Sequence, residues 1–473
     1  MSQWNMYFTG KSIGNLDISK TCRSAFCGPL AAPQRAGIAL ESLHMTTTTL
    51  IAPVATSPVA TCPVNGDRLW GALMDLAQIG ATPKGGSCRL ALTAEDGAGR
   101  DLVCGWMRDA GLAVQVDEVG NIFGIRPGQD NSLPPVMTGS HIDTQPTGGK
   151  FDGCYGVMAG LEVMRTLQQH KVQTQAPLAL AIWTNEEGSR FVPVMMGSGV
   201  HCDIFGKDVA LQARDHAGIS VAESLQAIGY AGTLPVGQLK PASYIEAHIE
   251  QGPILEAKDT VIGVVTGSLG LRWYDVTVTG MEAHAGPTPM ELRQDALYAA
   301  ASLMRTVVDI ANADAFSPDG RGTVGEVHVQ PNSRNVIPGQ VRFTVDLRHP
   351  KMDQLNAMEA AFRSAAAALQ AEGRVQVQVV DVQEFPATPF ADELVSAVAA
   401  SAAAHGYSHM PILTGAGHDA VYMARRFPTA MIFVPCKDGI SHNEIEDAQP
   451  AHLAAGCQVL CDVMLAQAGV VAA

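Results

Sequence analysis

The stretch GSHIDTQPTGGKFDG, residues 139–153, follows a short apolar run and places one histidine and two aspartates among several glycines. A turn needs no histidine, and a hydrophobic core does not favour carboxylates, so these polar side chains indicate a site. His141 and Asp143 are two residues apart and share one face of an extended strand end. Asp152 lies beyond a glycine-rich loop that can fold back towards them. The stretch therefore predicts polar side chains gathered where a strand ends.

Strand-like and helix-like segments alternate around this stretch. Residues 134–143 and 176–188 are apolar runs that end in polar clusters, and residues 155–170 between them have helical spacing. Residues 242–252 form another such run, and residues 113–128 alternate around a turn as a hairpin does. This order predicts an α/β fold with a mixed, mainly parallel sheet flanked by helices. Active groups are then expected at the carboxyl ends of the strands.

The pattern changes at about residue 263, where two long helices and about four strands suggest a self-contained α+β unit. After residue 383 the first pattern resumes. We therefore predict one domain at residues 66–262 and 384–473, interrupted by a smaller α+β domain at residues 263–383. Residues 1–65 lack periodicity, and we expect them to be disordered, or a non-native extension before a second start at Met45.

Composition excludes several classes of function. A hydrophobic content of 47% with 16% charged residues is typical of a soluble globular protein. The formal net charge of -15 argues against nucleic acid and against anionic membrane surfaces. No apolar run approaches the roughly 20 residues of a membrane span. The ten cysteines contain no CxxC pair and match no common zinc template, which predicts reduced thiols in a cytoplasmic protein.

Other segments supply further side chains that bind metals. Glu186 and Glu187 follow one predicted strand, His248 lies on another, and His442 lies near the C-terminus. Three histidines and two carboxylates suit zinc, or manganese, cobalt or nickel. Five ligands exceed what one catalytic zinc takes, so we expect two divalent cations per subunit with Asp152 shared between them. The predicted ligands are His141, Asp152 and His248 for one cation, and Asp152, Glu187 and His442 for the other.

Two further carboxylates have expected roles beside the cations. Two dications and two ligand carboxylates leave a net positive charge, which stabilises an anion that develops in a transition state. Asp143 is expected to fix the tautomer of His141, although it could simply cap a turn. Glu186 is expected to act as general base towards a water, and its alternative is a solvated neighbour of Glu187.

The chain resembles the M20 metallopeptidase clan, from about Asp67 to the C-terminus and with every motif in the expected order. Within the clan it is similar to the N-carbamoyl-L-amino-acid hydrolases, bacterial β-ureidopropionases and allantoate amidohydrolases. The resemblance implies a di-metal catalytic domain interrupted by a dimerisation or lid domain, with the metal ligands and the base at the positions given above. The motifs are GSHID…GGKFDG, WTNEEGSRF, IEAHIEQGPILE, EAHAGPTP, NVIPG, DLRHP, GAGHDA and SHNE.

The same resemblance implies residues that bind the substrate. Arg348 matches an arginine that clamps the substrate carboxylate, and Asn335 matches an accompanying amide. His284 matches a lid histidine that reaches the partner subunit's active site and supports the oxyanion. Gln251 and His418 match residues that line the pocket. Each has a structural alternative: an ion pair of Arg348 with Asp346 or Asp275, a loop cap for His284, and ordinary hydrogen bonds for Gln251 and His418.

The implied activity is hydrolysis of N-carbamoyl-L-amino acids or N-carbamoyl-β-alanine to the amino acid, ammonia and carbon dioxide. The implied protein is a cytoplasmic homodimer that acts on a small ureido substrate and binds neither nucleic acid nor membrane. An allantoate amidohydrolase is one alternative. A dipeptidase or aminoacylase of the clan is another, although those members usually carry a carboxylate in place of His248. A non-catalytic metal-binding scaffold is the last, although a scaffold has no reason to keep Glu186.

Overall fold

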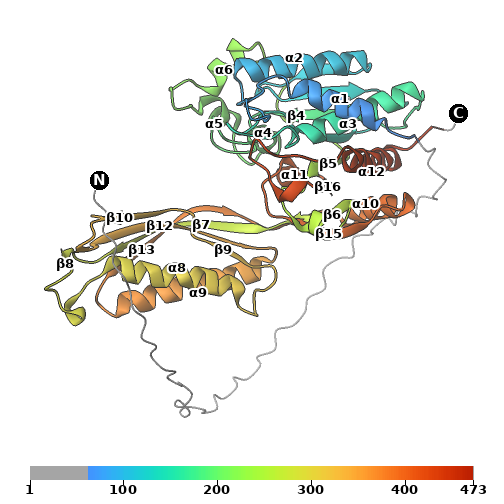
Figure 1. The fold of residues 1–473 in the computed structure, drawn as a ribbon. Coiled ribbons are helices and arrows are strands. Elements are labelled where there is room, and N and C mark those ends of the chain that lie inside the picture. The colour runs from blue at the N-terminus through green and yellow to red at the C-terminus, as the bar shows by residue number, and fades with distance from the viewer. Residues whose placement is uncertain (1–61, 472–473) are drawn as a thin grey trace, which may run out of the picture. The chain divides into compact units, whose positions relative to one another are not determined.

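The computed structural model describes residues 62–471, which form two main sheets with their own helices (Figure 1). The expectations for residues 1–61 lie outside the described residues. Residues 62–65, which the prediction assigned to the extension, pack against the rest of the chain. The backbone N–H of Val64 donates to Oε1 of Gln458 at 3.0 Å, and that of Asn65 donates to Oε1 of Glu162 at 2.8 Å. Contact with the fold therefore begins before residue 66.

The larger sheet has nine strands in the order β1-β2-β4-β3-β5-β16-β6-β14, and β15 pairs with β6. The neighbours β4, β3, β5 and β16 are parallel, whereas β1, β2 and β14 pair antiparallel. The predicted hairpin is the pair β1–β2. The strands are β1 (Ala113–Val116), β2 (Ile122–Arg126), β3 (Val136–His141), β4 (Leu178–Trp183), β5 (Ser243–Ile249), β6 (Ile262–Ser268), β14 (Thr388–Pro389), β15 (His409–Thr414) and β16 (Thr429–Val434).

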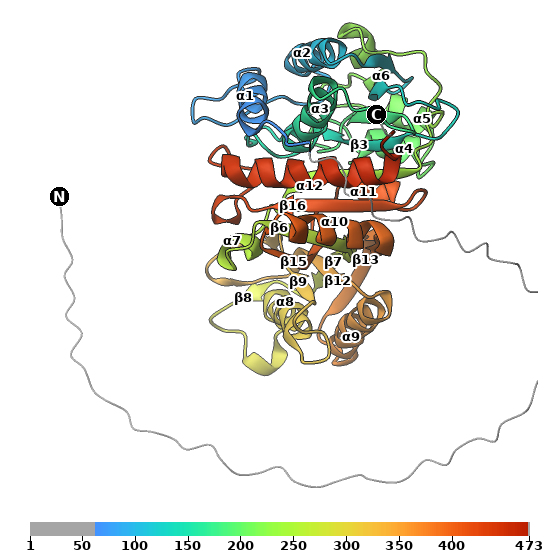
Figure 2. The same ribbon diagram turned by 90° about the vertical axis from the view of Figure 1, so that its right-hand side faces the viewer.

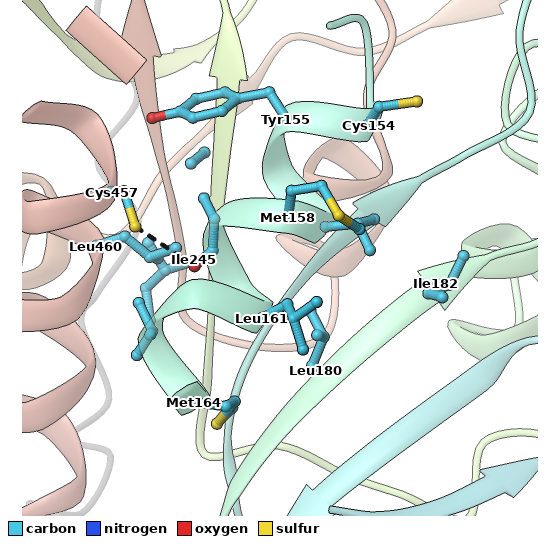
Figure 3. Close-up of a cluster of buried hydrophobic side chains, with 14 of the residues drawn as sticks. Cys154, Tyr155, Met158, Leu161, Met164, Leu180, Ile182, Ile245, Cys457 and Leu460 are labelled. Carbon is cyan, nitrogen blue, oxygen red and sulfur yellow. Dashed lines mark hydrogen bonds between the residues drawn. The ribbon is translucent and has the colours of Figure 1, made fainter. Parts of the chain in front are cut away.

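Helices cover this sheet because their apolar faces are buried against it. Helix α3 (Cys154–Gln169) packs on β3, and α12 (Pro450–Ala468) packs on α3, β5 and β16 (Figure 2). Figure 3 shows Leu161 of α3 beside Leu180 of β4, and Met158 and Ile182 belong to the same buried cluster. The other helices are α1 (Gly66–Leu76), α2 (Ala94–Asp109), α4 (Met196–His201), α5 (Lys207–Gln212), α6 (Val221–Ala227), α7 (Ile254–Ala257), α10 (Asp392–Ala404), α11 (Asp419–Met423) and the 3-10 turn η2 (Lys437–Gly439).

Helix α12 is apolar enough to resemble a membrane span by composition alone. It has 19 residues, and an 18-residue stretch of it has a mean hydropathy of 1.2 and is 67% buried inside the protein. Its side chains pack against α3, α10 and the sheet, as expected for the core helix of a globular fold. Its hydropathy is therefore explained by burial.

The smaller sheet belongs to the inserted segment, and its order is β10-β12-β7-β13 with β9 pairing with β12. Residues Tyr274, Val276 and Val278 alternate into a separate core between this sheet and the two long helices. Figure 1 shows the two helices along one face of the sheet. The elements are β7 (Gly270–Thr279), β8 (Ala283–His284), η1 (Met290–Leu292), α8 (Ala296–Asn312), β9 (Arg321–Thr323), β10 (Val327–Gln330), β11 (Val336–Ile337), β12 (Gln340–His349), α9 (Met352–Ala371) and β13 (Gln376–Phe385).

The predicted fold class is confirmed: a mixed sheet with a parallel centre is flanked by helices. The inserted segment has its own sheet and core, as the change of pattern at about residue 263 suggested. The proposed boundaries at residues 262 and 383 stay a prediction. What matters for function is the parallel centre, because four neighbouring strands there end at one edge.

Candidate metal centre

The candidate site lies at the carboxyl ends of the four neighbouring parallel strands. His141 is the last residue of β3, Glu187 follows β4, and His248 lies one residue before the end of β5. His442 lies on the loop that follows β16 and η2. Because these strands are adjacent and parallel, side chains from distant parts of the sequence meet at one edge of the sheet.

Asp152 stands between the two halves of the site. Its Oδ1 lies 3.2 Å from Nε2 of His248 and 3.9 Å from Nε2 of His141. Its Oδ2 lies 3.2 Å from Nε2 of His442, which is 3.3 Å from Oε2 of Glu187. In each group of three, the ligand atoms lie within 4.8 Å of one another. The five predicted ligands therefore come together, with one Asp152 oxygen towards each group.

Two of the histidine rings are held in the tautomer that a cation needs. Nδ1 of His141 donates to the backbone oxygen of Asp143 at 2.9 Å, and Nδ1 of His248 donates to that of Ile249 at 2.8 Å. A neutral ring that donates from Nδ1 keeps its lone pair on Nε2, and both Nε2 atoms face Asp152. This set of imidazole nitrogens and carboxylate oxygens fits borderline divalent cations.

The glycines of residues 139–153 let these side chains approach the backbone closely. At Gly153, which has a φ of +63°, a Cβ would stand 2.3 Å from the ring of His141. At Gly149 a Cβ would stand 2.0 Å from the carboxylate of Glu446. Neither distance leaves room for a methyl group. The glycines therefore allow His141 to contact the Asp152 loop, and they leave room for the Glu446 carboxylate against that loop.

Buried carboxylates dominate the electrostatics of the site. Burial and the charge of Asp152 raise the pKa of Glu187 to about 8. Burial alone would also raise the pKa of Asp152, but contacts with His248 and His442 hold it well below its ordinary value. Carboxylates crowded in this way repel one another unless positive charge lies between them. Bound metal ions supply such charge, and the side chains of both ligand groups are able to bind a metal ion.

Asp143 acts differently from its predicted role. The prediction gave its carboxylate the task of orienting His141, but the nearest carboxylate oxygen is 3.8 Å from Nδ1 and the backbone oxygen takes that hydrogen bond. The carboxylate instead accepts the backbone N–H groups of Glu186 and Glu187, each at 3.2 Å. An ionised carboxylate binds two such donors strongly, which is why it turns towards them. Asp143 therefore positions the main chain that carries Glu186 and Glu187.

Glu186 lies beside the predicted ligands without joining either group. Its Oε2 is 3.4 Å from Nε2 of His141, and the side chain is buried. Burial, with the charges of Asp419 and Glu187, raises its pKa well above the ordinary value. A carboxylate with a raised pKa next to a cation centre is suited to accept and return a proton. Its role as general base stays a prediction.

The sequence profile of the peptidase family M20/M25/M40 matches residues 137–466, which include every residue of both ligand groups. The chain belongs to the M20/M25/M40 peptidase family. The resemblance drawn from the motifs is confirmed. Dependence on metal is a property of the M20 family, and both groups of three residues are able to bind metal ions.

Relatives of this M20 family chain cover nearly its whole described length. It is 45% identical over 408 residues to the N-carbamoyl-L-amino-acid amidohydrolase of Rhizobium meliloti, covering 86% of this chain and 98% of that protein. It is 32% identical over 391 residues to the allantoate amidohydrolase of Bacillus subtilis, covering 82% and 94%. The crystal structure of a hydantoinase/carbamoylase family amidase from Burkholderia multivorans has a TM-score of 0.84 at 50% identity, covering 86% and 99%.

Arg348 on β12 does not join either ligand group. Its Nε donates to Oδ1 of Asp346 at 3.0 Å, and its Nη2 donates to Oδ2 at 2.6 Å. Arg348 therefore forms the ion pair with Asp346 that the sequence analysis gave as its structural alternative. A further bond from Nη1 to the backbone oxygen of Gly415 places Arg348 beside the loop that leads to His418. The two side chains are partly exposed, and the predicted contact of Arg348 with a substrate carboxylate stays a prediction.

His284 and Asn335 lie together on the inserted segment and belong to neither ligand group. Strand β8 pairs with β11, and the backbone N–H of Ala285 donates to the backbone oxygen of Asn335 at 2.9 Å. Nδ1 of His284 accepts the N–H of Gly286 at 3.0 Å, which is the loop cap left open as its alternative. Both side chains are exposed. Their predicted contacts with substrate stay predictions.

Gln251 and His418 do contact the centre. Nε2 of Gln251 donates to Oδ2 of Asp152 at 2.8 Å. The ring of His418 packs edge-on against that of His248 with centroids 4.5 Å apart, and its Nε2 lies 3.0 Å from Oγ1 of Thr414. These contacts place both residues at the centre, whereas their predicted role in lining a substrate pocket stays a prediction.

Several residues of the centre escaped the sequence analysis, among them Glu246, which with His248 and His418 forms a third group that could hold a metal ion. Oγ of Ser441 lies 2.9 Å from Oδ2 of Asp152, and the Glu446 carboxylate accepts the backbone N–H of Asp152 at 3.1 Å. Nε2 of Gln145 donates to Oε2 of Glu187 at 2.7 Å. Gln145 belongs to the opening stretch and Ser441 to the SHNE motif, so their closeness in sequence to ligands was a usable signal. No motif or pattern in the sequence indicated that Glu446 belongs to the site.

Proposed function

We propose that the chain hydrolyses N-carbamoyl-L-amino acids to the free amino acid, ammonia and carbon dioxide. The observation that carries this proposal is the pair of ligand groups that share Asp152, with the buried carboxylate of Glu186 3.4 Å from one of their histidines. The substrate class is supported by the 45% identity to a protein named N-carbamoyl-L-amino-acid amidohydrolase. The activity is that of a hydrolase acting on linear amides.

The proposed centre takes two divalent cations per subunit, zinc or else manganese, cobalt or nickel. His141, Asp152 and His248 would hold one cation, and Asp152, Glu187 and His442 the other. Such cations polarise a carbonyl and lower the pKa of bound water. The proposal is supported by the bonds of His141 and His248 through Nδ1 to backbone oxygens, with their Nε2 atoms 3.9 and 3.2 Å from Oδ1 of Asp152.

Glu186 is the proposed proton carrier. It takes a proton from the attacking water as the oxygen adds to the ureido carbon, and it returns that proton to the nitrogen that leaves when the C–N bond breaks. The carbamic acid that remains loses carbon dioxide. Asp143 keeps the Glu186 carboxylate in place through the backbone amide at 3.2 Å.

Arg348 and Asn335 are the proposed contacts for the substrate carboxylate, and Gln251 and His418 line the pocket at the centre. His284 is proposed to act across a dimer, in the site of a second copy of this chain. Large apolar side chains are exposed on the segment that follows His284, namely Met290, Leu292 and Tyr298. Exposed apolar surface of this kind favours burial against another subunit. The described cysteines are all free, which supports a cytoplasmic location.

Allantoate is the second candidate substrate, because a relative at 32% identity is named allantoate amidohydrolase. Both candidates carry a ureido group on the carbon that bears the carboxylate. The identity to the N-carbamoyl-L-amino-acid enzyme is higher, and we therefore favour that class. A scaffold without catalysis is disfavoured because Glu186 is kept buried beside the ligand groups.

The test is a metal-reconstitution assay on the full chain. The protein is stripped with a chelator, reloaded separately with zinc, manganese, cobalt or nickel, and offered several N-carbamoyl-L-amino acids, N-carbamoyl-β-alanine, allantoate and a dipeptide. We expect metal-dependent ammonia release, fastest from an N-carbamoyl-L-amino acid. Fastest release from allantoate would move the assignment to the second candidate. No release from any ureido substrate by protein that holds two cations would overturn the proposal.

A further inference from the structure

Glu446 is a buried carboxylate at the centre that belongs to neither ligand group. It lies on the loop between η2 and α12, four residues after His442, and it is 2% exposed. A carboxylate removed from water in this way is retained only where its oxygens are satisfied by donors. The hydrogen-bond partners of the two Glu446 oxygens therefore indicate the role of this side chain.

One oxygen of Glu446 holds the loop that carries Asp152. Oε1 accepts the backbone N–H of Phe151 at 2.8 Å and that of Asp152 at 3.1 Å. The approach is possible because Gly149 has no side chain, and a Cβ there would stand 2.0 Å from Oε1. Two charge-assisted bonds to consecutive amides fix the direction in which the Asp152 side chain leaves the backbone.

The other oxygen holds the loop that carries His442. Oε2 lies 2.8 Å from Oγ of Ser441, and the same hydroxyl lies 2.9 Å from Oδ2 of Asp152. That Asp152 oxygen is the one 3.2 Å from Nε2 of His442. Glu446 thus ties the His442 loop to the shared carboxylate through Ser441.

His442 needs such support more than the other histidines do. His141 and His248 lie on buried strands and bond through Nδ1 to backbone oxygens. His442 is 50% exposed, lies on a loop and has a φ of +53°, in the left-handed region that disfavours residues other than glycine. The half of the centre formed by Asp152, Glu187 and His442 therefore depends on its loop.

We propose that Glu446 is a positioning residue that sets the distance between Asp152 and His442, and thereby the affinity of the cation site they form with Glu187. The inference rests on the proposed two-cation centre. It does not rest on the substrate. Loss of Glu446 should weaken the second cation site more than the first, because Asp152 belongs to both sites but strands hold the rings of His141 and His248. Groups that orient metal ligands typically contribute about 10- to 100-fold in affinity.

The experiment measures how many cations the full-length protein holds. Wild type, E446A, E446Q and E444Q are stripped, reloaded with zinc, and analysed for bound zinc across a series of competing chelator concentrations. Glu444 provides the matched control, because it lies on the same loop and its side chain is also largely buried, at 11% exposed, but it pairs with Lys84 at 3.3 Å. Thermal unfolding of each metal-free variant is recorded alongside.

E446A should hold its second zinc at least about tenfold more weakly than wild type, and its first zinc within about threefold. E446Q should recover most of that loss, because its amide oxygen accepts both backbone N–H groups and its nitrogen donates to Ser441. E444Q should match wild type. A merely structural role would lower the melting temperature of the metal-free protein without separating the two zinc affinities.

Equal zinc affinities in E446A and wild type would overturn the inference, and so would an equal loss at both sites. If E446A does not fold, S441A takes its place, because it removes only the hydroxyl that links Glu446 to Asp152, and unchanged zinc binding by S441A would overturn the inference. Wild-type protein that holds two zinc ions but releases no ammonia would overturn the proposed substrate and leave this inference standing. Wild-type protein that holds fewer than two would overturn the proposed centre and the inference with it.

Discussion

Oδ1 of Asp143 accepts the backbone N–H of Glu186 at 3.2 Å, which joins the loops that follow two neighbouring parallel strands. Asp143 follows β3 and Glu186 follows β4. The second oxygen of Asp143 accepts the next amide, that of Glu187. A proposed base and a proposed ligand are therefore placed by the same buried carboxylate, and the spacing between them and His141 depends on it.

Replacement of Asp143 by asparagine should lower kcat. An asparagine side chain has one accepting oxygen, so one of the two amides at Glu186 and Glu187 loses its partner, which costs about 1–3 kcal/mol when that amide is buried. Misplacement of the base should reduce kcat at least about tenfold. Steady-state kinetics would measure the fall in kcat, and the zinc content would be measured on the same preparation. D203N is the control, because the Asp203 side chain is 81% exposed, and wild-type kcat in D143N would contradict the prediction.

Replacement of Glu186 by glutamine should remove proton transfer without removing the cations. The two side chains have nearly the same shape, and Glu186 belongs to neither ligand group. We expect kcat to fall at least about 100-fold, the usual scale for loss of a general base, while the zinc content stays at the wild-type value. Ammonia release and elemental analysis provide the two readouts. An E186Q variant with full activity would remove Glu186 from the mechanism.

Much of the centre could be predicted from sequence because parallel strands impose a simple rule. Polar residues after apolar strands gather at one sheet edge, and His141, Glu187 and His248 satisfy that rule. Asp152 was predictable because glycines beside it allow a close return of the chain. His442 lies on a loop, where hydrophobic periodicity gives no signal, and it was predicted from the SHNE motif. The α/β class followed from the same alternation of strands and helices.

What the sequence could not predict was which atom of a residue makes each contact. The Asp143 carboxylate and the Asp143 backbone oxygen are equally present in the sequence, and only the folded chain shows that the oxygen of the backbone meets His141. Glu446 resembles any surface glutamate in sequence, yet it is buried because Gly149 leaves room for it. Arg348 reaches Asp346 because both point to one face of β12.

Replacement of Gly149 by alanine adds only a methyl group, but it should disrupt the metal centre. The added Cβ would stand 2.0 Å from Oε1 of Glu446, so either the carboxylate or the Asp152 loop must move. We expect a lower melting temperature and weaker zinc binding. G71A is the matched control, because a Cβ at Gly71 within α1 meets nothing within 4 Å and alanine favours a helix by roughly 0.5–1 kcal/mol. Wild-type zinc affinity in G149A would contradict the prediction.

A pH-dependent loss of stability should arise at His201, outside the centre. This ring is buried beside Phe123, Trp183 and Phe427, and burial lowers its pKa from 6.5 to about 4. Between those values the unfolded chain binds a proton that the folded chain refuses, so stability falls as the pH falls from 6.5 towards 4. Above pH 6.5 the His201 ring is neutral in both the folded and the unfolded chain, so it causes no loss of stability there. The whole shift corresponds to about 3 kcal/mol.

The measurement that isolates His201 is the difference in unfolding free energy between wild type and H201F at a series of pH values. Phenylalanine carries no titratable proton, so any packing penalty it introduces is the same at every pH, whereas the cost of protonating the histidine grows only in acid. The difference should therefore shift in favour of H201F as the pH falls from 6.5 towards 4, and both proteins should be measured metal-free so that ligand protonation affects them equally. A difference that stays constant across this range would show that the His201 ring is already protonated, or still hydrated, in the folded protein.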